Sequence, residues 1–191
     1  MQSYDDVPVI DSFHLGLTVH IQNDMQARPW IVDVGLGDMP YEPLPLMNGR
    51  YKQGSFVYPV TDSQVNPSGW RVEHDPNGSF VGMDVDPASV DGMTEFASQH
   101  LHLSQSPGSA WRKLLILKNR CATENHELKG CVFTVRDRNG SHQSEIEQRS
   151  VWLDILADVF GEYLPDYSTS QQHALWDKVI RSHEDWKRSG G

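Results

Sequence analysis

The sequence lacks the features that mark membrane-spanning, secreted and nucleic-acid-binding proteins. No apolar run approaches the roughly 20 residues that cross a bilayer, and the segment from Met1 to Asp6 has neither the basic nor the apolar region of a signal peptide. Lys and Arg total 16 against 26 Asp and Glu, which gives a formal net charge of −10. This acidic excess argues against nucleic acid or an anionic membrane as the partner, and we expect a cytoplasmic protein.

Cysteine is also scarce. Cys121 and Cys131 are the two cysteines, and no Cys-x-x-Cys pair is present. This excludes a disulfide framework and leaves a zinc site without its usual signature. In a reducing compartment we expect both to be free, buried thiols. Neither stands at the electropositive helix start that lowers a thiol pKa, so we interpret both as structural.

The first half of the chain has the composition of short antiparallel strands. Hydrophobic residues make up 38% of the 191 residues, which is enough for one large domain or two small ones. The proline-rich segment from Asp38 to Leu46 excludes a helix or a central strand and predicts an extended loop. Strands separated by turn residues are predicted at 55–60, 69–74 and 79–81. This pattern is typical of an antiparallel barrel or sandwich.

In the second half, helical patterns join the strands. The composition shifts at Asp86, and spaced apolar residues predict a helix over 90–103. Strands are predicted at 111–118 and 127–135, and helices at 151–160, ending at Gly161, and at 171–186. We therefore expect an α+β fold.

Two segments near the start predict a β-hairpin that carries chemistry. Phe13 to Ile21 and Pro29 to Gly37 are apolar over strand length, with a polar break between them. In the first segment, alternation places Leu15, Leu17, Val19 and Ile21 on one face and His14, Gly16, Thr18 and His20 on the other. In the second, Asp33 interrupts an apolar run, where an ionised carboxylate is costly to bury without a partner. We therefore predict that His14 and Asp33 meet across the hairpin.

Three interpretations of this pair stay open. In the first, His14 is a general base, and Asp33 fixes its tautomer and stabilises the imidazolium. In the second, the two residues are a polar pair that only satisfies itself inside the fold. In the third, His14 and His20 share a face and bind a metal, although the sequence supplies no convincing third ligand.

Two loops are weaker candidates for binding small molecules. Gly35-Leu36-Gly37 marks a bend after a strand, and it lacks the Gly-x-x-x-x-Gly-Lys-Ser/Thr pattern of a phosphate loop. The segment from Ser104 to Ser109 offers hydroxyls and free backbone amides that could hold a phosphate-bearing cofactor. Most stretches of this composition are only connections between elements.

The hairpin resembles a known family. Phe13-His14-Leu15 leading to Val32-Asp33-Val34-Gly35-Leu36-Gly37 is similar to the arylamine N-acetyltransferase family, in which a strand-borne His precedes an Asp-Val-Gly-Phe-Gly turn. Later matches follow in chain order: Pro43-Leu44-Pro45-Leu46, Gly69-Trp70, Phe96 with the Ser104–Ser109 segment, Phe160-Gly161 and Leu175-Trp176. The resemblance implies a fold of the cysteine-protease-like superfamily without its N-terminal helical domain. It divides the chain into a β-barrel domain over 1–85, a connecting helix and loop over 86–110, and an α/β lid over 111–191.

The resemblance also implies a chemistry. In that family a Cys-His-Asp triad takes an acetyl group from acetyl-CoA as a thioester and passes it to an arylamine, an arylhydrazine or a heterocyclic amine. By resemblance, His14 would activate the nucleophile and Asp33 would orient His14, with no metal involved. Leu36 stands where the family usually has Phe, so Leu36 and Gly37 would line the acceptor pocket. The phosphates of acetyl-CoA would lie against Ser104, Ser106, Gly108 and Ser109.

One part of the family pattern is missing. The family's nucleophile belongs to an Arg-Gly-Gly-x-Cys motif upstream of the His, and no such motif precedes His14. We therefore expect that the nucleophile lies outside this chain, on a separate N-terminal helical domain or chain, and that the chain alone is inactive. An uncovered apolar face would then remain on the barrel. The rival hypothesis is a non-catalytic binding or scaffold domain derived from the family.

Overall fold

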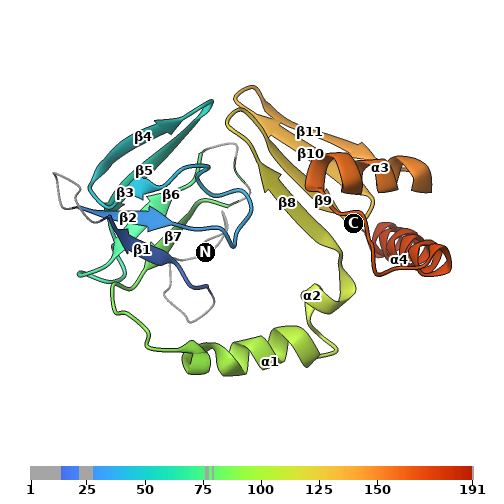
Figure 1. Ribbon diagram of the computed structural model, residues 1–191, viewed down its shortest axis with the longest axis horizontal. Coiled ribbons are helices and arrows are strands. Elements are labelled where there is room, and N and C mark those ends of the chain that lie inside the picture. Colours follow the sequence, from blue (N-terminus) through green and yellow to red (C-terminus); the bar gives the residue numbers. More distant parts are fainter. Residues whose placement is uncertain (1–13, 22–27, 76–77, 79, 191) are drawn as a thin grey trace.

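The computed structural model describes residues 14–21, 28–75, 78 and 80–190, and it has an α+β fold of three antiparallel sheets with few helices (Figure 1). The predictions for Met1 to Asp6, for Phe13, for the loop after Ile21 and for Ser79 lie outside the described residues. Two sheets belong to the first half of the chain and one to the second (Figure 1).

The first sheet contains the predicted hairpin. Strands β1 (Leu17–His20) and β2 (Pro29–Val32) pair antiparallel, with Leu17 opposite Val32, and β3 (Leu44–Pro45) adds two residues to the other edge of β2. All four residues of β1 are exposed, and the apolar side chains Leu15, Leu17, Val19 and Ile21 are 39–54% exposed. The apolar face of this strand is therefore not part of the core.

The second sheet is a four-stranded meander. Its order is β4-β5-β6-β7, with the bounds Gly49–Gln53, Phe56–Asp62, Trp70–Glu73 and Gly82–Val85. In β5 the side chains of Phe56, Tyr58 and Val60 are buried while those between them are partly exposed, which is the alternation that builds a one-sided core. The sequence prediction missed β4, which has no apolar alternation, and placed the last strand at 79–81.

The first two sheets share a core but do not close into a barrel. Ile31 and Leu44 of the first sheet lie in one buried cluster with Tyr58, Val72 and Met83 of the second. No ladder joins the two sheets within the described residues, so this part of the chain shows no closed barrel. Pro43 precedes the short β3 and Pro45 is its second residue, and neither has an N–H to donate, which favours an edge position for this strand.

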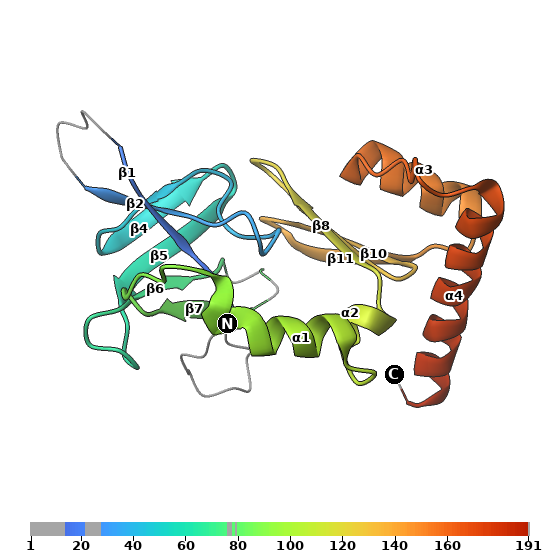
Figure 2. The same cartoon turned by 60° about the horizontal axis from the view of Figure 1, so that its bottom comes forward.

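A helical segment connects the two halves. It consists of a short 3₁₀ helix (Met93–Phe96), α1 (Ala97–Gln105) and α2 (Ala110–Lys113), and none of these helices has a buried residue. Figures 1 and 2 show α1 bridging the two halves along one side of the molecule. The predicted strand at 111–118 is instead one helical turn followed by a strand, because Ser109 ends the extended connection and begins α2.

The third sheet and two helices form the second half. The order is β11-β10-β9-β8, with β8 (Ile116–Arg120), β9 (Asn125–Lys129), β10 (Val132–Asp137) and β11 (Gly140–Glu145). Helices α3 (Arg149–Phe160) and α4 (Thr169–Arg188) lie on the side away from the first half (Figure 2). Leu128, Trp152, Leu156 and Val179 form the centre of a separate core. Gly161 ends α3 in a left-handed conformation, as predicted, and Ser168 begins α4 with a capping box.

Candidate active site

His14 and Asp33 meet as the hairpin predicts. The Nε2 atom of His14 lies 2.6 Å from Oδ2 of Asp33, and the side chains are 18% and 2% exposed, respectively. The β1–β2 register sets Leu17 opposite Val32, and both residues of the pair lie just beyond the paired ends of these strands. The strand ends thus hold an imidazole against a buried carboxylate while leaving part of the ring accessible.

Gly35 completes this arrangement, and the sequence analysis named it only as part of the Gly35-Leu36-Gly37 bend. Its backbone N–H donates to Oδ1 of Asp33 at 2.9 Å, so both carboxylate oxygens are engaged. A Cβ at this position would lie 2.8 Å from Cε1 of His14, which is closer than side chains normally approach. Only glycine therefore lets the turn pass so close to the imidazole. In the sequence, the feature that indicates this close approach is a glycine two residues after Asp33.

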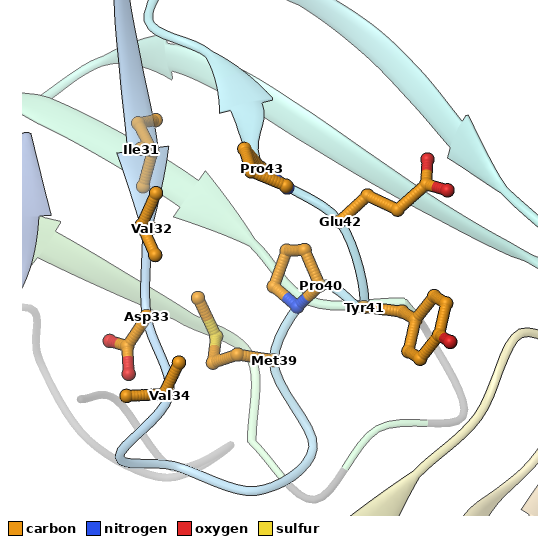
Figure 3. A pocket seen from close by; sticks show the side chains of 9 residues that line it. All are labelled: Ile31, Val32, Asp33, Val34, Met39, Pro40, Tyr41, Glu42 and Pro43. Carbon is orange, nitrogen blue, oxygen red and sulfur yellow. The ribbon is translucent and has the colours of Figure 1, made fainter. Parts of the chain in front are cut away.

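A small pocket lies between the end of β2 and the proline-rich loop that follows the Asp33 turn. Its lining comes from the end of β2 and from the proline-rich loop: Ile31, Val32, Asp33, Val34, Met39, Pro40, Tyr41, Glu42 and Pro43. Figure 3 shows Asp33 and Val34 on one wall, with Pro40, Tyr41 and Glu42 on the other. Leu36 packs against the first core and Gly37 lies against Lys118, and neither is among the residues that line this pocket.

A buried charged cluster lies behind the turn, where the two halves of the chain meet. Asp38 is fully buried, and its Oδ2 lies 3.5 Å from Nζ of Lys118 and 3.7 Å from Nε2 of His74. Arg120 stacks over the ring of Phe56, with its guanidinium carbon 4.0 Å from the ring centroid. Sequence reasoning missed this cluster; the available signal was Lys118 and Arg120, two residues apart and therefore on one face of a strand.

Burial controls the ionisation of this cluster. It lowers the pKa of His74 against the opposing effects of the Asp38 carboxylate and of hydrogen bonds to the carbonyls of Asp38 and Asp75. Burial also raises the pKa of Tyr58, and the nearby Arg120 cation only partly offsets that rise. His74 is thus held toward its neutral form, which matches its full enclosure beside Tyr58 and Phe80.

Comparison with known proteins identifies the family. A family model described as N-acetyltransferase matches residues 4–167. The chain belongs to the N-acetyltransferase family. This confirms the family membership that the hairpin motif indicated. No match was found among the curated proteins.

Solved arylamine N-acetyltransferases have the same fold. The Mycobacterium marinum enzyme in complex with CoA is 22% identical, with a TM-score of 0.74 over 92% of this chain and 64% of its own. The Mycobacterium abscessus enzyme is 16% identical, with a TM-score of 0.71 over 89% and 60%. The Salmonella typhimurium enzyme is 17% identical, with a TM-score of 0.70 over 90% and 63%. This N-acetyltransferase chain spans about three fifths of the length of these structures.

The predicted phosphate-binding loop of this N-acetyltransferase is engaged in local hydrogen bonds. Ser104 Oγ donates to the carbonyl of His100, and Ser109 Oγ donates to that of Leu103. Ser106 Oγ accepts from the backbone N–H of Gly108 at 3.2 Å. The loop follows the C-terminal end of α1 (Figures 1 and 2). The hydroxyls of its three serines are bonded to backbone groups of α1 or of the loop itself.

Both thiols of this N-acetyltransferase chain belong to the second half. Cys131 is buried in the second core, as predicted, and burial raises the pKa of its thiol. Cys121 is exposed in the β8–β9 turn, which corrects the prediction that it is buried. Slight burial raises the pKa of Cys121, but hydrogen bonds with Thr123 and Glu124 outweigh this and lower it overall.

The described part of the chain has neither a metal-binding group of side chains nor a helix suited to cross a membrane. Residues 14–21, 28–75, 78 and 80–190 contain no group of three or more His, Cys, Asp or Glu side chains arranged to hold a metal ion, and His14 and His20 belong to no such group. Over the same residues, no helix combines the length and the apolar character needed to cross a bilayer.

Proposed function

We propose that this chain supplies the general base and the orienting carboxylate of an arylamine N-acetyltransferase. The observation that carries the proposal is the 2.6 Å contact between His14 Nε2 and Asp33 Oδ2 at the edge of an N-acetyltransferase fold. A carboxylate that accepts from one ring nitrogen fixes the tautomer and leaves the other nitrogen free to take a proton. Because Nε2 faces Asp33, Nδ1 is the nitrogen left for this task.

The proposed reaction is an acetyl transfer in two steps. Nδ1 of His14 takes the proton of a cysteine thiol, and the thiolate attacks the acetyl carbon of acetyl-CoA. The carbon–sulfur bond to CoA breaks, CoA leaves as its thiol with a proton from the imidazolium, and the acetyl group remains on the cysteine as a thioester. An aromatic amine or hydrazine then attacks this thioester, the carbon–sulfur bond to the cysteine breaks, and the N-acetylated product leaves. His14 takes the proton that the nitrogen loses and returns it to the cysteine sulfur.

The nucleophile would come from outside this chain. Cys121 lies in the β8–β9 turn and Cys131 in the second core, whereas His14 lies at the start of the first sheet. The exposed apolar face of β1, next to His14, supports a docked helical domain or chain that carries the thiol. This chain alone would then be inactive.

The binding roles of the loops remain predictions. The Mycobacterium marinum structure holds CoA, and by analogy we propose acetyl-CoA as the co-substrate of this chain, without a metal. Its phosphates would lie against Ser104, Ser106, Gly108 and Ser109. The Ser106 hydroxyl accepts from Gly108 and keeps its own hydrogen to donate, whereas the hydroxyls of Ser104 and Ser109 already donate to backbone carbonyls. Leu36 and Gly37 would contact the acceptor. A cytoplasmic role in the metabolism of foreign aromatic amines is part of the same proposal.

A binding or scaffold role is the second candidate. The observation that favours it is the placement of both thiols in the second half of the chain, since an imidazole without a thiolate has nothing to activate. The two candidates differ in whether acetyl transfer occurs once a thiol is supplied.

The deciding experiment measures acetyl transfer from acetyl-CoA to an arylhydrazine. The chain is assayed alone and together with the sequence encoded upstream, and acetyl-CoA binding to the chain alone is measured by calorimetry. We expect binding in both forms and transfer only in the second. Asp33→Asn should reduce transfer by about 10⁴-fold, and His14→Gln by at least as much, as loss of the corresponding triad members does elsewhere.

His20→Gln is the matched control, because His20 is an exposed histidine on β1, the strand that follows His14. It should transfer acetyl groups at the wild-type rate. Transfer that survives in His14→Gln would contradict the proposed mechanism. Binding of acetyl-CoA without transfer, once a thiol is supplied, would favour the scaffold role.

A further inference from the structure

The turn that carries Asp33 ends in a second buried carboxylate, Asp38. Asp38 is fully enclosed, and its Oδ2 lies 3.5 Å from Nζ of Lys118 and 3.7 Å from Nε2 of His74. Its backbone carbonyl accepts a 2.6 Å hydrogen bond from His74 Nε2 and lies 3.5 Å from Nη1 of Arg120. Burying a carboxylate is costly unless it is paired, so these partners hold Asp38 in one position.

These partners come from both halves of the chain. His74 follows β6 in the first half, whereas Lys118 and Arg120 belong to β8 in the second. Gly37 has a left-handed conformation (φ 73°), and a Cβ there would lie 2.4 Å from Cβ of Lys118. The turn is therefore pressed directly against β8, and the Asp38–Lys118 contact joins the two halves.

The same turn carries the His14–Asp33 pair at its other end. Asp33 accepts from the N–H of Gly35, and Gly35 lies against the ring of His14. The segment from Asp33 to Asp38 is thus held at its start by the imidazole and at its end by the buried cluster. A displacement of about 1 Å at such a pair can cost on the order of 100-fold in rate. Movement of the turn at Asp38 would therefore disturb the contact between Asp33 and His14.

We propose that Asp38 is a positioning residue, which holds the turn in place through its contacts with Lys118 and His74 and thereby aligns Asp33 with His14. The consequence for catalysis rests on the proposed transferase function, whereas the geometric consequence does not. Loss of the Asp38 charge removes the ion pair with Lys118 and so weakens the attachment of the turn to β8. The hydrogen bond between His14 and Asp33 then opens more often.

Asp38→Asn tests this, because it keeps the size of the side chain and removes its charge. Glu127→Gln is the matched control, since Glu127 Oε2 lies 3.2 Å from the same Nζ of Lys118 but belongs to β9 and not to the turn. The readout on the chain alone is the proton NMR signal of His14 Nε2–H, identified by its loss in His14→Gln. We expect Asp38→Asn to speed its exchange with solvent about tenfold and Glu127→Gln to leave it unchanged.

A second readout is acetyl transfer by the chain supplied with its thiol partner. Asp38→Asn should lower kcat by about 10- to 100-fold with little change in KM, and Glu127→Gln should retain the wild-type kcat. If the transferase function is wrong, all variants lack transfer while the NMR signal still distinguishes Asp38→Asn from Glu127→Gln. If only the positioning role is wrong, wild type and Asp38→Asn share the same exchange rate and the same kcat.

Lys118→Met keeps the inference testable if Asp38→Asn does not fold, which circular dichroism would show. Methionine retains an aliphatic stem against Gly37 and removes the cation that faces Asp38. Exchange of the His14 proton should again be faster than in wild type. A folded Lys118→Met protein with wild-type exchange would overturn the proposal.

Discussion

The two halves of the chain cover their apolar strands to different extents. In the second half, Leu128, Trp152 and Leu156 are at most 1% exposed, and two helices cover the sheet. In the first half, β1 leaves its apolar side chains 39–54% exposed, and Val34 beside Asp33 is 86% exposed. The second half therefore completes its own core, whereas the first leaves apolar surface beside its candidate site. Uncovered apolar surface of this kind marks an interaction site.

The largest expected effect is the loss of a core side chain in the second half. Trp152 is fully buried, lies 5.6 Å from the ring of Trp176 and donates from Nε1 to the carbonyl of Gly130. Trp152→Ala should lower the free energy of unfolding by about 3–5 kcal/mol, because it leaves a cavity and an unpaired carbonyl. Urea unfolding followed by circular dichroism measures this.

Trp186→Ala is the control for that substitution, since it removes the same side chain where it is 55% exposed on α4. Its only described ring partner is His183, and the loss should be below about 1 kcal/mol. Equal losses in the two variants would show that the second half does not complete its core as described.

The next effect concerns the candidate site. Gly35→Ala places a Cβ 2.8 Å from the His14 ring, so the imidazole must move away from Asp33. We expect acetyl transfer by the thiol-supplied enzyme to fall about 10- to 100-fold, or roughly 1.4–2.7 kcal/mol in the activation free energy. Gly92→Ala is the control, because nothing lies within 4 Å of a Cβ at that position. Equal rates in the two variants would contradict the close approach at Gly35.

The same comparison separates what the sequence could predict from what it could not. The His14–Asp33 contact follows from local alternation and the cost of burying a carboxylate, and both are readable from residues close to the hairpin. Cys131, the end of α3 at Gly161 and most of α4 were predictable for similarly local reasons. An uncovered apolar face was expected only from the family resemblance, because alternation shows that a strand has two faces but not which one another element covers. The Asp38 cluster joins residues about 80 positions apart, which no local pattern connects.

A smaller effect should appear with pH at the junction of the two halves. Burial lowers the pKa of His74 below its ordinary value of 6.5, although the Asp38 carboxylate opposes this. Between that lowered pKa and 6.5 the unfolded chain binds a proton that folded His74 does not, so acid shifts the equilibrium toward unfolding. The free energy of unfolding should therefore fall as the pH drops below about 6.5 and level off once folded His74 also titrates.

Urea unfolding at pH 7.5 and pH 5 measures that contribution. Wild type should lose more stability between the two conditions than His74→Gln, because the variant lacks the group that titrates differently in the two states. His142→Gln, which removes an exposed histidine from β11, should match wild type. An identical loss in wild type and His74→Gln would mean that burial does not lower the pKa of His74.

The smallest change in stability is expected on β1, where the effect on association is the informative one. Leu17 is 46% exposed, so Leu17→Thr removes little buried area and keeps a residue that favours strands. The free energy of unfolding should change by no more than about 0.5 kcal/mol. Self-association measured by sedimentation should nevertheless decrease, because the apolar face that drives it is interrupted. A wild-type chain that stays monomeric at high concentration would contradict this. In that case the exposed apolar side chains of the first half would not drive association, and the first half would be as complete a folding unit as the second.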